Sequence, residues 1–142
     1  MKKIAILSIL LAVLVACAPA QPKTAALAKE DFKVGFIGPL SGDVASLGVP
    51  VRQAAELALE ETNANNLLNG RKMTMIFEDD QCDPKKTTTI AQKFVEVDKV
   101  TAVAGPFCSG TVLASAPIFE PAKVLVLAPG ATNPKIKDSG DY

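Results

Sequence analysis

The stretch that decides the fold is Phe32-Lys33-Val34-Gly35-Phe36-Ile37-Gly38-Pro39-Leu40-Ser41-Gly42. Its first part, 32–38, is mostly apolar and contains aromatic and β-branched side chains, which is typical of a β-strand. Gly38 and Pro39 break the strand, and the small residues after them predict a loop over 40–47. The fold therefore starts with a short strand that carries a glycine-containing loop at its carboxyl end.

A helix is predicted directly after this loop. Pro50 suits the first turn of a helix, where a missing backbone N–H has no consequence. The helix should end in the segment 63–70, which is rich in Asn and Gly. A helical period gives it one small and apolar face. That face consists of Val51, Ala54, Ala55, Ala58 and Thr62.

Strand-like and helix-like runs continue to alternate beyond this helix. A second helix should start at Pro84 and present an apolar face that includes Phe94. Ser109 is a suitable N-cap for a third helix that runs to about Glu120, although Pro117 should kink or end it. The remaining predicted strands are 73–77, 101–105 and 124–128.

This alternation predicts an α/β fold. Successive βαβ units with right-handed crossovers give a parallel sheet with helices on both faces. The loops that follow the strands collect at the carboxyl edge of such a sheet, where ligands bind in open α/β folds. We therefore expect function in the loops 39–47, 79–84, 106–109 and 129–134.

The composition excludes several functional classes. The 142 residues contain no histidine, so neither a Ser-His-Asp triad nor a Cys-His dyad nor a His-ligated zinc site can form. Basic and acidic residues balance at 15 each and only 5% of residues are aromatic, so no nucleic-acid partner is predicted. The spacing of Gly35, Gly38 and Gly42 is not that of a dinucleotide site, and no P-loop occurs, so no cofactor is predicted.

The N-terminus has the features of an export signal. Residues 1–16 combine two lysines with an apolar run that is too short for the roughly 20 residues of a membrane span. The run ends in Leu14-Val15-Ala16-Cys17, which resembles the lipobox of bacterial lipoproteins. Cys17 would then carry a lipid anchor and 17–29 would be the linker. Cleavage after Ala20, as in ordinary secretion, is the alternative.

Two cysteines fall in the loops at the carboxyl edge. Cys82 follows the second strand and Cys108 the third, and an exported protein meets an oxidising environment, so a disulfide is predicted. A reactive thiol or a metal-binding pair are the alternatives. The neighbouring acids could form a Mg²⁺ or Ca²⁺ site, but a solvated loop in which Asp83 starts a helix is the favoured interpretation. These acids are Glu78, Asp79, Asp80 and Asp83.

Two further segments could bind the charged ends of an amino acid. Ser109 would place its hydroxyl beside the first free N–H groups of a helix, an arrangement suited to a small carboxylate. The segment 130–132 could bring a backbone carbonyl and the Thr132 hydroxyl to the same edge for an ammonium group. Both features are also ordinary choices for a helix start and a turn.

Four blocks of the sequence, 30–42, 79–85, 105–111 and 128–134, together resemble a known family. In order and spacing they are similar to the branched-chain amino-acid-binding proteins of ABC importers, the Leu/Ile/Val type of periplasmic binding protein. The resemblance implies a type I lobe within a two-lobed receptor that closes on its ligand. Relative to that family, 30–142 correspond to an incomplete first lobe with the second lobe absent, as in an N-terminal fragment.

The resemblance also implies roles for individual residues. The family's disulfide falls on Cys82 and Cys108. Leucine replaces the aromatic residue often found at the first loop, which leaves side-chain specificity open. The ligand-binding positions implied are Ser109, Gly130, Ala131, Thr132 and Leu47.

The function implied is capture of an amino acid, in particular a branched-chain one, by an exported lipoprotein anchored at the outer membrane face or in the periplasm. ABC permease subunits in the membrane would be its partners, and no catalytic step is expected. The alternatives are a sensory ligand-binding module of similar fold, or a binder of amides, urea or other small carboxylates. A thiol-disulfide catalyst that uses Cys82 and Cys108 is a more distant alternative.

Overall fold

The computed structural model describes residues 30–142. The predicted signal peptide at 1–16, the lipidation site Cys17 and the linker 17–29 lie outside these residues. Within the part of the chain that the structure describes, no helix combines the length and apolar composition needed to cross a membrane.

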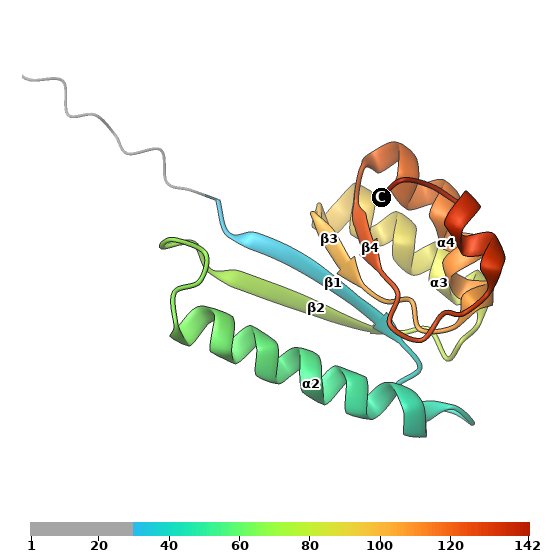
Figure 1. The fold of residues 1–142 in the computed structure, drawn as a ribbon, viewed down its shortest axis with the longest axis horizontal. Helices are drawn as coiled ribbons and strands as arrows, with labels where there is room; N and C mark the ends of the chain where they lie inside the picture. Colours follow the sequence, from blue (N-terminus) through green and yellow to red (C-terminus); the bar gives the residue numbers. More distant parts are fainter. Residues whose placement is uncertain (1–29) are drawn as a thin grey trace, which may run out of the picture.

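A four-stranded parallel sheet forms the centre of the fold, in the order β2-β1-β3-β4 (Figure 1). The first strand pairs with its neighbour over its whole length, from Phe32 opposite Met73 to Gly38 opposite Asp79. The predicted parallel α/β sheet is confirmed. Its strands are β1 (Phe32–Gly38), β2 (Met73–Asp79), β3 (Ala102–Ala104) and β4 (Leu125–Leu127).

Helices lie on both faces of the sheet, as predicted. Figure 1 shows α2 along one face, beneath β1 and β2, and α3 and α4 together on the other face. The helix after β2 widens into a π-helical turn before β3 begins. The helical elements are α2 (Ala45–Ala64), α3 (Pro84–Lys93), η1 (Phe94–Asp98), α4 (Ser109–Ala122) and the 3₁₀ helix η2 (Pro134–Asp138).

Helix α2 starts earlier than predicted. It begins at Ala45, so Pro50 lies inside the helix rather than in its first turn. Gly48 explains the early start, because a Cβ at that position would lie 2.0 Å from the carbonyl oxygen of Pro39. Only glycine lets the helix backbone approach the end of β1 this closely.

The packed face of α2 also differs from the predicted one. Ala54 and Ala58 are exposed, whereas Arg52 and Glu56 are half-buried. The Arg52 guanidinium lies 4.9 Å from the centre of the Phe77 ring, and its side chain covers this part of the sheet. The sequence pattern missed this face because a long charged side chain can pack through its carbon atoms.

Helix α4 continues through both of its prolines. Pro117 was expected to kink or end the helix, but the helix extends to Ala122 and stops at Lys123, whose backbone is left-handed. Phe119 follows Pro117 and is 1% exposed. Continuing the helix places this ring in the core, and that burial offsets the lost hydrogen bond of the proline.

The apolar core lies between the sheet and the α3–η1–α4 layer. It joins side chains of β1, β3 and all three helical segments in one cluster. Gly35 is part of this arrangement, because a Cβ there would lie 2.2 Å from the Phe94 ring. The buried cluster consists of Ile37, Ile90, Ala91, Phe94, Val100, Val103, Phe119 and Val124.

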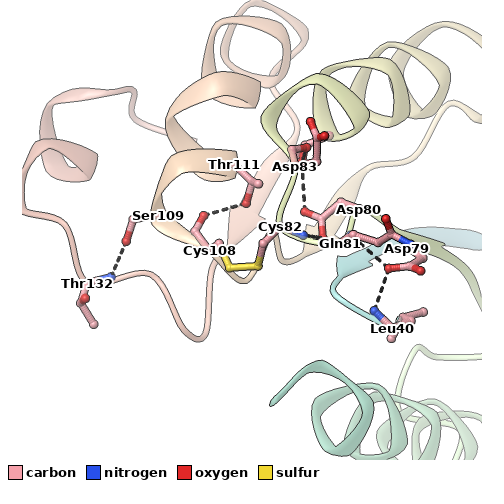
Figure 2. Close-up of a disulfide and its surroundings, with 11 residues drawn as sticks. Leu40, Asp79, Asp80, Gln81, Cys82, Asp83, Cys108, Ser109, Thr111 and Thr132 are labelled. Atoms are coloured by element: carbon pink, nitrogen blue, oxygen red, sulfur yellow. Dashed lines mark hydrogen bonds between the residues drawn. A yellow bond between two sulfur atoms is a disulfide. The ribbon is translucent and has the colours of Figure 1, made fainter. Parts of the chain in front are cut away.

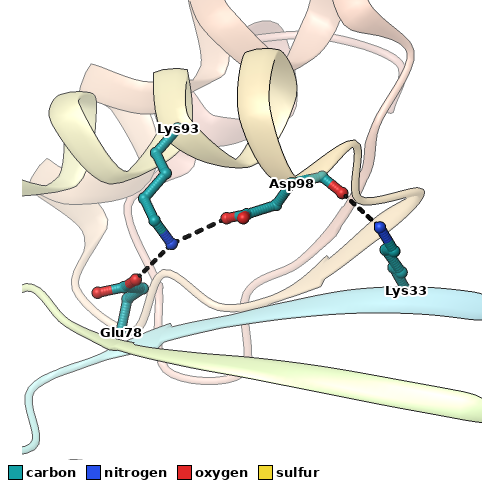
Figure 3. A network of polar contacts seen from close by, with 4 residues as sticks. All are labelled: Lys33, Glu78, Lys93 and Asp98. Atoms are coloured by element: carbon teal, nitrogen blue, oxygen red, sulfur yellow. Dashed lines mark hydrogen bonds and ion pairs between the residues drawn. The ribbon is translucent and has the colours of Figure 1, made fainter.

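An ion-pair network ties this helical layer to the strands (Figure 3). Lys93 Nζ lies 2.8 Å from Glu78 Oε1 on β2 and 2.9 Å from Asp98 Oδ2 on η1. The hydrogen bond to Glu78, followed by that to Asp98, raises the pKa of Lys93. Lys33 on β1 donates to the Asp98 carbonyl at 3.3 Å. The network is exposed, so its contribution to stability is small.

Candidate functional site

Three tertiary contacts connect the loops at the carboxyl ends of the four strands. One carboxylate joins the β1–α2 loop to the end of β2, a disulfide joins the β2–α3 loop to the β3–α4 loop, and one hydroxyl joins α4 to the loop after β4. Figure 2 shows these three links side by side. They turn four separate loops into one connected rim.

Asp79 makes the first link. Its Oδ1 accepts hydrogen bonds from the backbone N–H of Leu40 at 2.8 Å and of Gln81 at 3.1 Å. Its Oδ2 accepts from the Ser41 hydroxyl at 2.5 Å. Burial alone would raise the pKa of Asp79, but these hydrogen bonds, led by that of Ser41, hold it below the usual value. The Asp79 carboxylate is therefore ionised in the folded protein at neutral pH.

The second link is the disulfide between Cys82 and Cys108, whose Cα atoms are 5.7 Å apart. The two cysteines belong to the loops after β2 and β3, the strands that flank β1. The bond thus spans the end of the central strand. Cys108 is also the N-cap residue of α4, so the disulfide fixes the start of that helix.

The acidic loop between β2 and α3 starts a helix. Asp83 is the N-cap of α3 and accepts from the backbone N–H of Lys85 at 2.7 Å and of Lys86 at 3.3 Å. Asp80 is fully buried, and its carboxylate bonds the Cys82 N–H and the Thr87 hydroxyl, each at 3.0 Å. Burial raises the pKa of Asp80. The helix-start interpretation of Asp83 is confirmed.

These acids do not converge on a common point. Glu78 pairs with Lys93, and Asp79 accepts hydrogen bonds from the β1–α2 loop. Asp80 and Asp83 accept hydrogen bonds from their own loop and from the start of α3. Among residues 30–142, no group of three or more acidic or thiol side chains could hold a metal ion.

Ser109 makes the third link. Its Oγ accepts from the backbone N–H of Thr132 at 3.1 Å and of Asn133 at 3.2 Å. The expectation that Ser109 caps α4 is wrong, because Cys108 is the N-cap residue and Ser109 is the first helical residue. Its hydroxyl turns toward the loop after β4, whose N–H groups lie beyond the strand and need an acceptor.

This geometry leaves hydrogen-bond donors at the rim. An oxygen that accepts two hydrogen bonds still has its own hydrogen to donate, so the Ser109 hydroxyl remains a donor. The first N–H groups of a helix have no partner within the helix, and α4 begins without a side-chain cap. Hydroxyl and helix start thus offer several donors to one negatively charged group.

The segment 130–132 lies beside this helix start. A Cβ on Gly130 would lie 2.6 Å from the ring of Phe107, so glycine lets the loop after β4 pack directly on the loop after β3. Ala131 is half-buried and Thr132 is exposed. The structure therefore brings Ser109, Gly130, Ala131 and Thr132 into one region.

Leu47 lies apart from this region. It is in the first turn of α2 and its side chain is 53% exposed. Within residues 30–142, no hydrogen bond or buried cluster joins it to Ser109 or Thr132. The predicted positions thus form two sets. Ser109 and the segment 130–132 lie at the start of α4, and the apolar side chain of Leu47 lies on α2.

Sequence reasoning missed the role of Asp79 as a link. The available signal was its position at the end of the second strand, beside the end of the first. The register that pairs Gly38 with Asp79 places this carboxylate next to Leu40 and Ser41. Phe107 was also missed, since nothing in its own segment indicates a contact with Gly130.

Comparisons with known proteins give a consistent result. The family model described as periplasmic binding protein matches residues 31–141. An amino acid binding protein from Pseudomonas aeruginosa is 36% identical over 110 residues, which are 78% of this chain and 29% of that protein.

Solved structures of similar fold include two binding proteins with ligands. The branched-chain amino acid transporter substrate binding protein LivJ from Streptococcus pneumoniae, in complex with isoleucine, matches 79% of this chain and 32% of its own with a TM-score of 0.75 and 28% identity. A solute binding protein of an ABC transporter from Rhodopseudomonas palustris, in complex with 3,4-dihydroxy benzoic acid, matches 78% and 30% with a TM-score of 0.67 and 30% identity. The chain spans less than a third of the length of each of these relatives.

Proposed function

This chain belongs to the periplasmic binding protein family, and on that premise we propose that it captures an amino acid outside the cytoplasm and delivers it to an ABC importer. Its role is reversible binding without a catalytic step. The arrangement of Ser109 and Thr132 at the start of α4 is the observation that carries this proposal. A parallel sheet that gathers its loops at one edge is the usual place for such a site.

The residues at the start of α4 offer donors and acceptors for both charged ends of an amino acid. The Ser109 hydroxyl and the free N–H groups of the helix start are donors, and a carboxylate accepts only. The Gly130 carbonyl and the Thr132 hydroxyl are acceptors for an ammonium group, with Ala131 between them. A zwitterion is therefore bound at both ends by groups within one region.

A branched-chain amino acid is the proposed ligand. The relative from Streptococcus pneumoniae was solved with isoleucine, and the relative from Pseudomonas aeruginosa is named an amino acid binding protein. On this chain, Leu47 presents an exposed apolar side chain on α2 that an aliphatic ligand could contact. We assign the aliphatic part of the ligand to this side of the rim.

The proposed cellular arrangement follows from the N-terminal sequence. Residues 1–16 direct export, Cys17 is lipidated, and 17–29 tether residues 30–142 to the outer face of the membrane, where permease subunits receive the ligand. Cleavage after Ala20 would instead release the protein. Mass spectrometry of the mature N-terminus distinguishes a lipid on Cys17 from a free Gln21.

A titration with leucine tests the proposed site. We expect leucine to shift the NMR signals of Ser109, Gly110 and Thr132 in the isotope-labelled protein, with an affinity weaker than about 1 mM for a single partial lobe. Ser109→Ala should weaken binding about tenfold or more, because a hydrogen bond to a charged group is lost. Thr89→Ala, on the exposed side of α3, is the matched control and should leave binding unchanged.

Two outcomes would contradict the proposal. Leucine-induced shifts confined to segments away from the start of α4 would place the ligand elsewhere. An unchanged affinity in Ser109→Ala would show that this hydroxyl does not contact the carboxylate.

A small carboxylate without an ammonium group is the second candidate ligand. The relative from Rhodopseudomonas palustris was solved with 3,4-dihydroxy benzoic acid, which has a carboxylate but no amine. Comparing leucine with 4-methylpentanoate, which is leucine without its amine, separates the two candidates. Equal affinity for both would favour the carboxylate binder, and a strong preference for leucine would favour the amino-acid binder.

A further inference from the structure

The β1–α2 loop is held at the rim by one side chain from another strand. Leu40 donates its N–H to Asp79 Oδ1 at 2.8 Å, and Ser41 donates its hydroxyl to Asp79 Oδ2 at 2.5 Å. Gln81 supports this arrangement, because its Nε2 donates to the Ser41 oxygen at 2.5 Å and its own N–H reaches Asp79. Lys86 in turn donates to the side-chain oxygen of Gln81.

The position of this loop determines the position of the first turn of α2. The helix starts only a few residues after Ser41, and Gly48 packs directly on the Pro39 carbonyl. Leu47 precedes Gly48 and projects from the same turn. A shift of Pro39 and Leu40 would therefore move Leu47 with them.

We propose that Asp79 is a positioning residue for ligand specificity. Its carboxylate fixes the β1–α2 loop, and through this loop it fixes where Leu47 stands on the α2 side of the rim. Asp79 itself does not contact the ligand. The inference rests on the proposed function, because it assigns Leu47 to the aliphatic part of the ligand.

The contact between Leu40 and Asp79 is separate from the contact between Ser109 and Thr132. Figure 2 shows Leu40 and Asp79 on one side of the disulfide and Ser109 and Thr132 on the other. The Ser109–Thr132 hydrogen bond uses no atom of the Asp79 network. Loss of Asp79 should therefore affect the side-chain part of ligand recognition and spare the part that binds the charged ends.

The hydrogen-bond pattern requires a carboxylate at this position. All three groups that face the two oxygens of Asp79 are donors. An asparagine in its place could keep the bonds from Leu40 and Gln81 through its oxygen, but its NH₂ would face a Ser41 hydroxyl that has lost its acceptor. Asp79→Asn should thus be intermediate between the natural protein and Asp79→Ala.

The test measures affinity for leucine and for alanine in parallel by NMR titration of the full chain. For Asp79→Ala we expect leucine affinity to fall roughly tenfold, while alanine affinity changes less than about twofold, because alanine lacks the aliphatic contact. Asp79→Asn and Ser41→Ala should lose part of the leucine preference. Glu78→Gln is the matched control, since it also removes one negative charge from β2, and it should keep the preference.

The outcomes separate this inference from the proposed function. Equal losses for leucine and alanine in the Asp79 variants, or no change in the ratio, would overturn the positioning role. If Asp79→Ala does not fold, an unchanged ratio in both Asp79→Asn and Ser41→Ala would overturn it equally. Ser109→Ala should weaken both ligands to the same extent, and failure of that result alone would count against the proposed function instead.

Discussion

The two faces of the sheet differ in how completely they are covered. On the α3–η1–α4 face, Phe94 and Phe119 are fully buried in one apolar cluster. On the other face α2 lies along β1 and β2, while Leu125 and Leu127 of β4 are 58% and 71% exposed. Val126 between them packs on the cluster, as the alternation of a strand requires.

The comparison shows where the free energy of folding comes from in this chain. The stabilising free energy of apolar burial scales with the area removed from water. Most of this free energy is therefore gained on the α3–η1–α4 face. The α2 face depends on partial contacts such as that of Arg52 on Phe77. The rim loops lie at the boundary between the two faces, and polar links and one disulfide hold them in place.

The largest expected difference between the faces concerns buried aromatic rings. Phe94→Ala should lower the free energy of unfolding by about 3–5 kcal/mol, because it removes a fully buried ring and leaves a cavity. Leu57→Ala on the outer side of α2, where the side chain is 56% exposed, should change it by less than about 0.5 kcal/mol. Urea denaturation of both variants measures this contrast. Similar losses in the two variants would mean that the faces contribute equally.

The disulfide should have the next largest effect, since it stabilises the rim rather than either face. It closes a segment of 26 sequence positions, for which loop entropy predicts a contribution of about 3.5 kcal/mol. The double variant Cys82→Ala, Cys108→Ala should lose about this amount in urea denaturation. Reductant should destabilise the natural protein and leave the double variant unaffected. A reductant effect of equal size in both would argue against the disulfide.

The contributions of the neighbouring residues Asp79 and Asp80 to stability should change with pH in opposite directions. The pKa of Asp79 is lowered in the folded protein, so its contribution to stability is present above its unfolded value of 3.8 and is lost as pH falls through the folded value. The pKa of Asp80 is raised by burial, so its contribution is present below the unfolded value and is lost as pH rises through the folded value.

Asparagine variants of both residues make this opposition measurable. At neutral pH, Asp79→Asn should lower the free energy of unfolding by about 1 kcal/mol through the lost hydrogen bond from Ser41. Asp80→Asn should leave it unchanged or raise it, because a buried charge is removed while the Cys82 and Thr87 contacts can be kept. Denaturation curves across the acidic range test both signs. Destabilisation of the same size in both variants at neutral pH would contradict the assignment.

The smallest effect is expected on the uncovered part of the α2 face. Leu127→Thr introduces a β-branched residue, which suits an edge strand, and removes an exposed apolar side chain, so it should change stability by less than about 0.5 kcal/mol. It should also reduce self-association, which light scattering at increasing concentration measures. A large loss of stability would show that Leu127 is buried in solution.

Much of the fold was predictable because it depends on local patterns. The parallel sheet, the helices on both faces and the Asp83 cap follow from runs of apolar residues, breakers and a helix-start signal that lie close together in sequence. The errors occurred where distant contacts overrode these signals. Gly48 on Pro39 moved the start of α2, and burial of Phe119 carried α4 through Pro117.

The sequence by itself determined which residues reach the rim. Each strand ends in a recognisable loop, and parallel strands place these loops at one edge. Only the tertiary structure decided how the loops are linked. The hydrogen bond from Leu40 to Asp79 and that from Thr132 to Ser109 join segments 39 and 23 positions apart. Such contacts depend on strand order and register, which the packing of the whole sheet sets and no local pattern encodes.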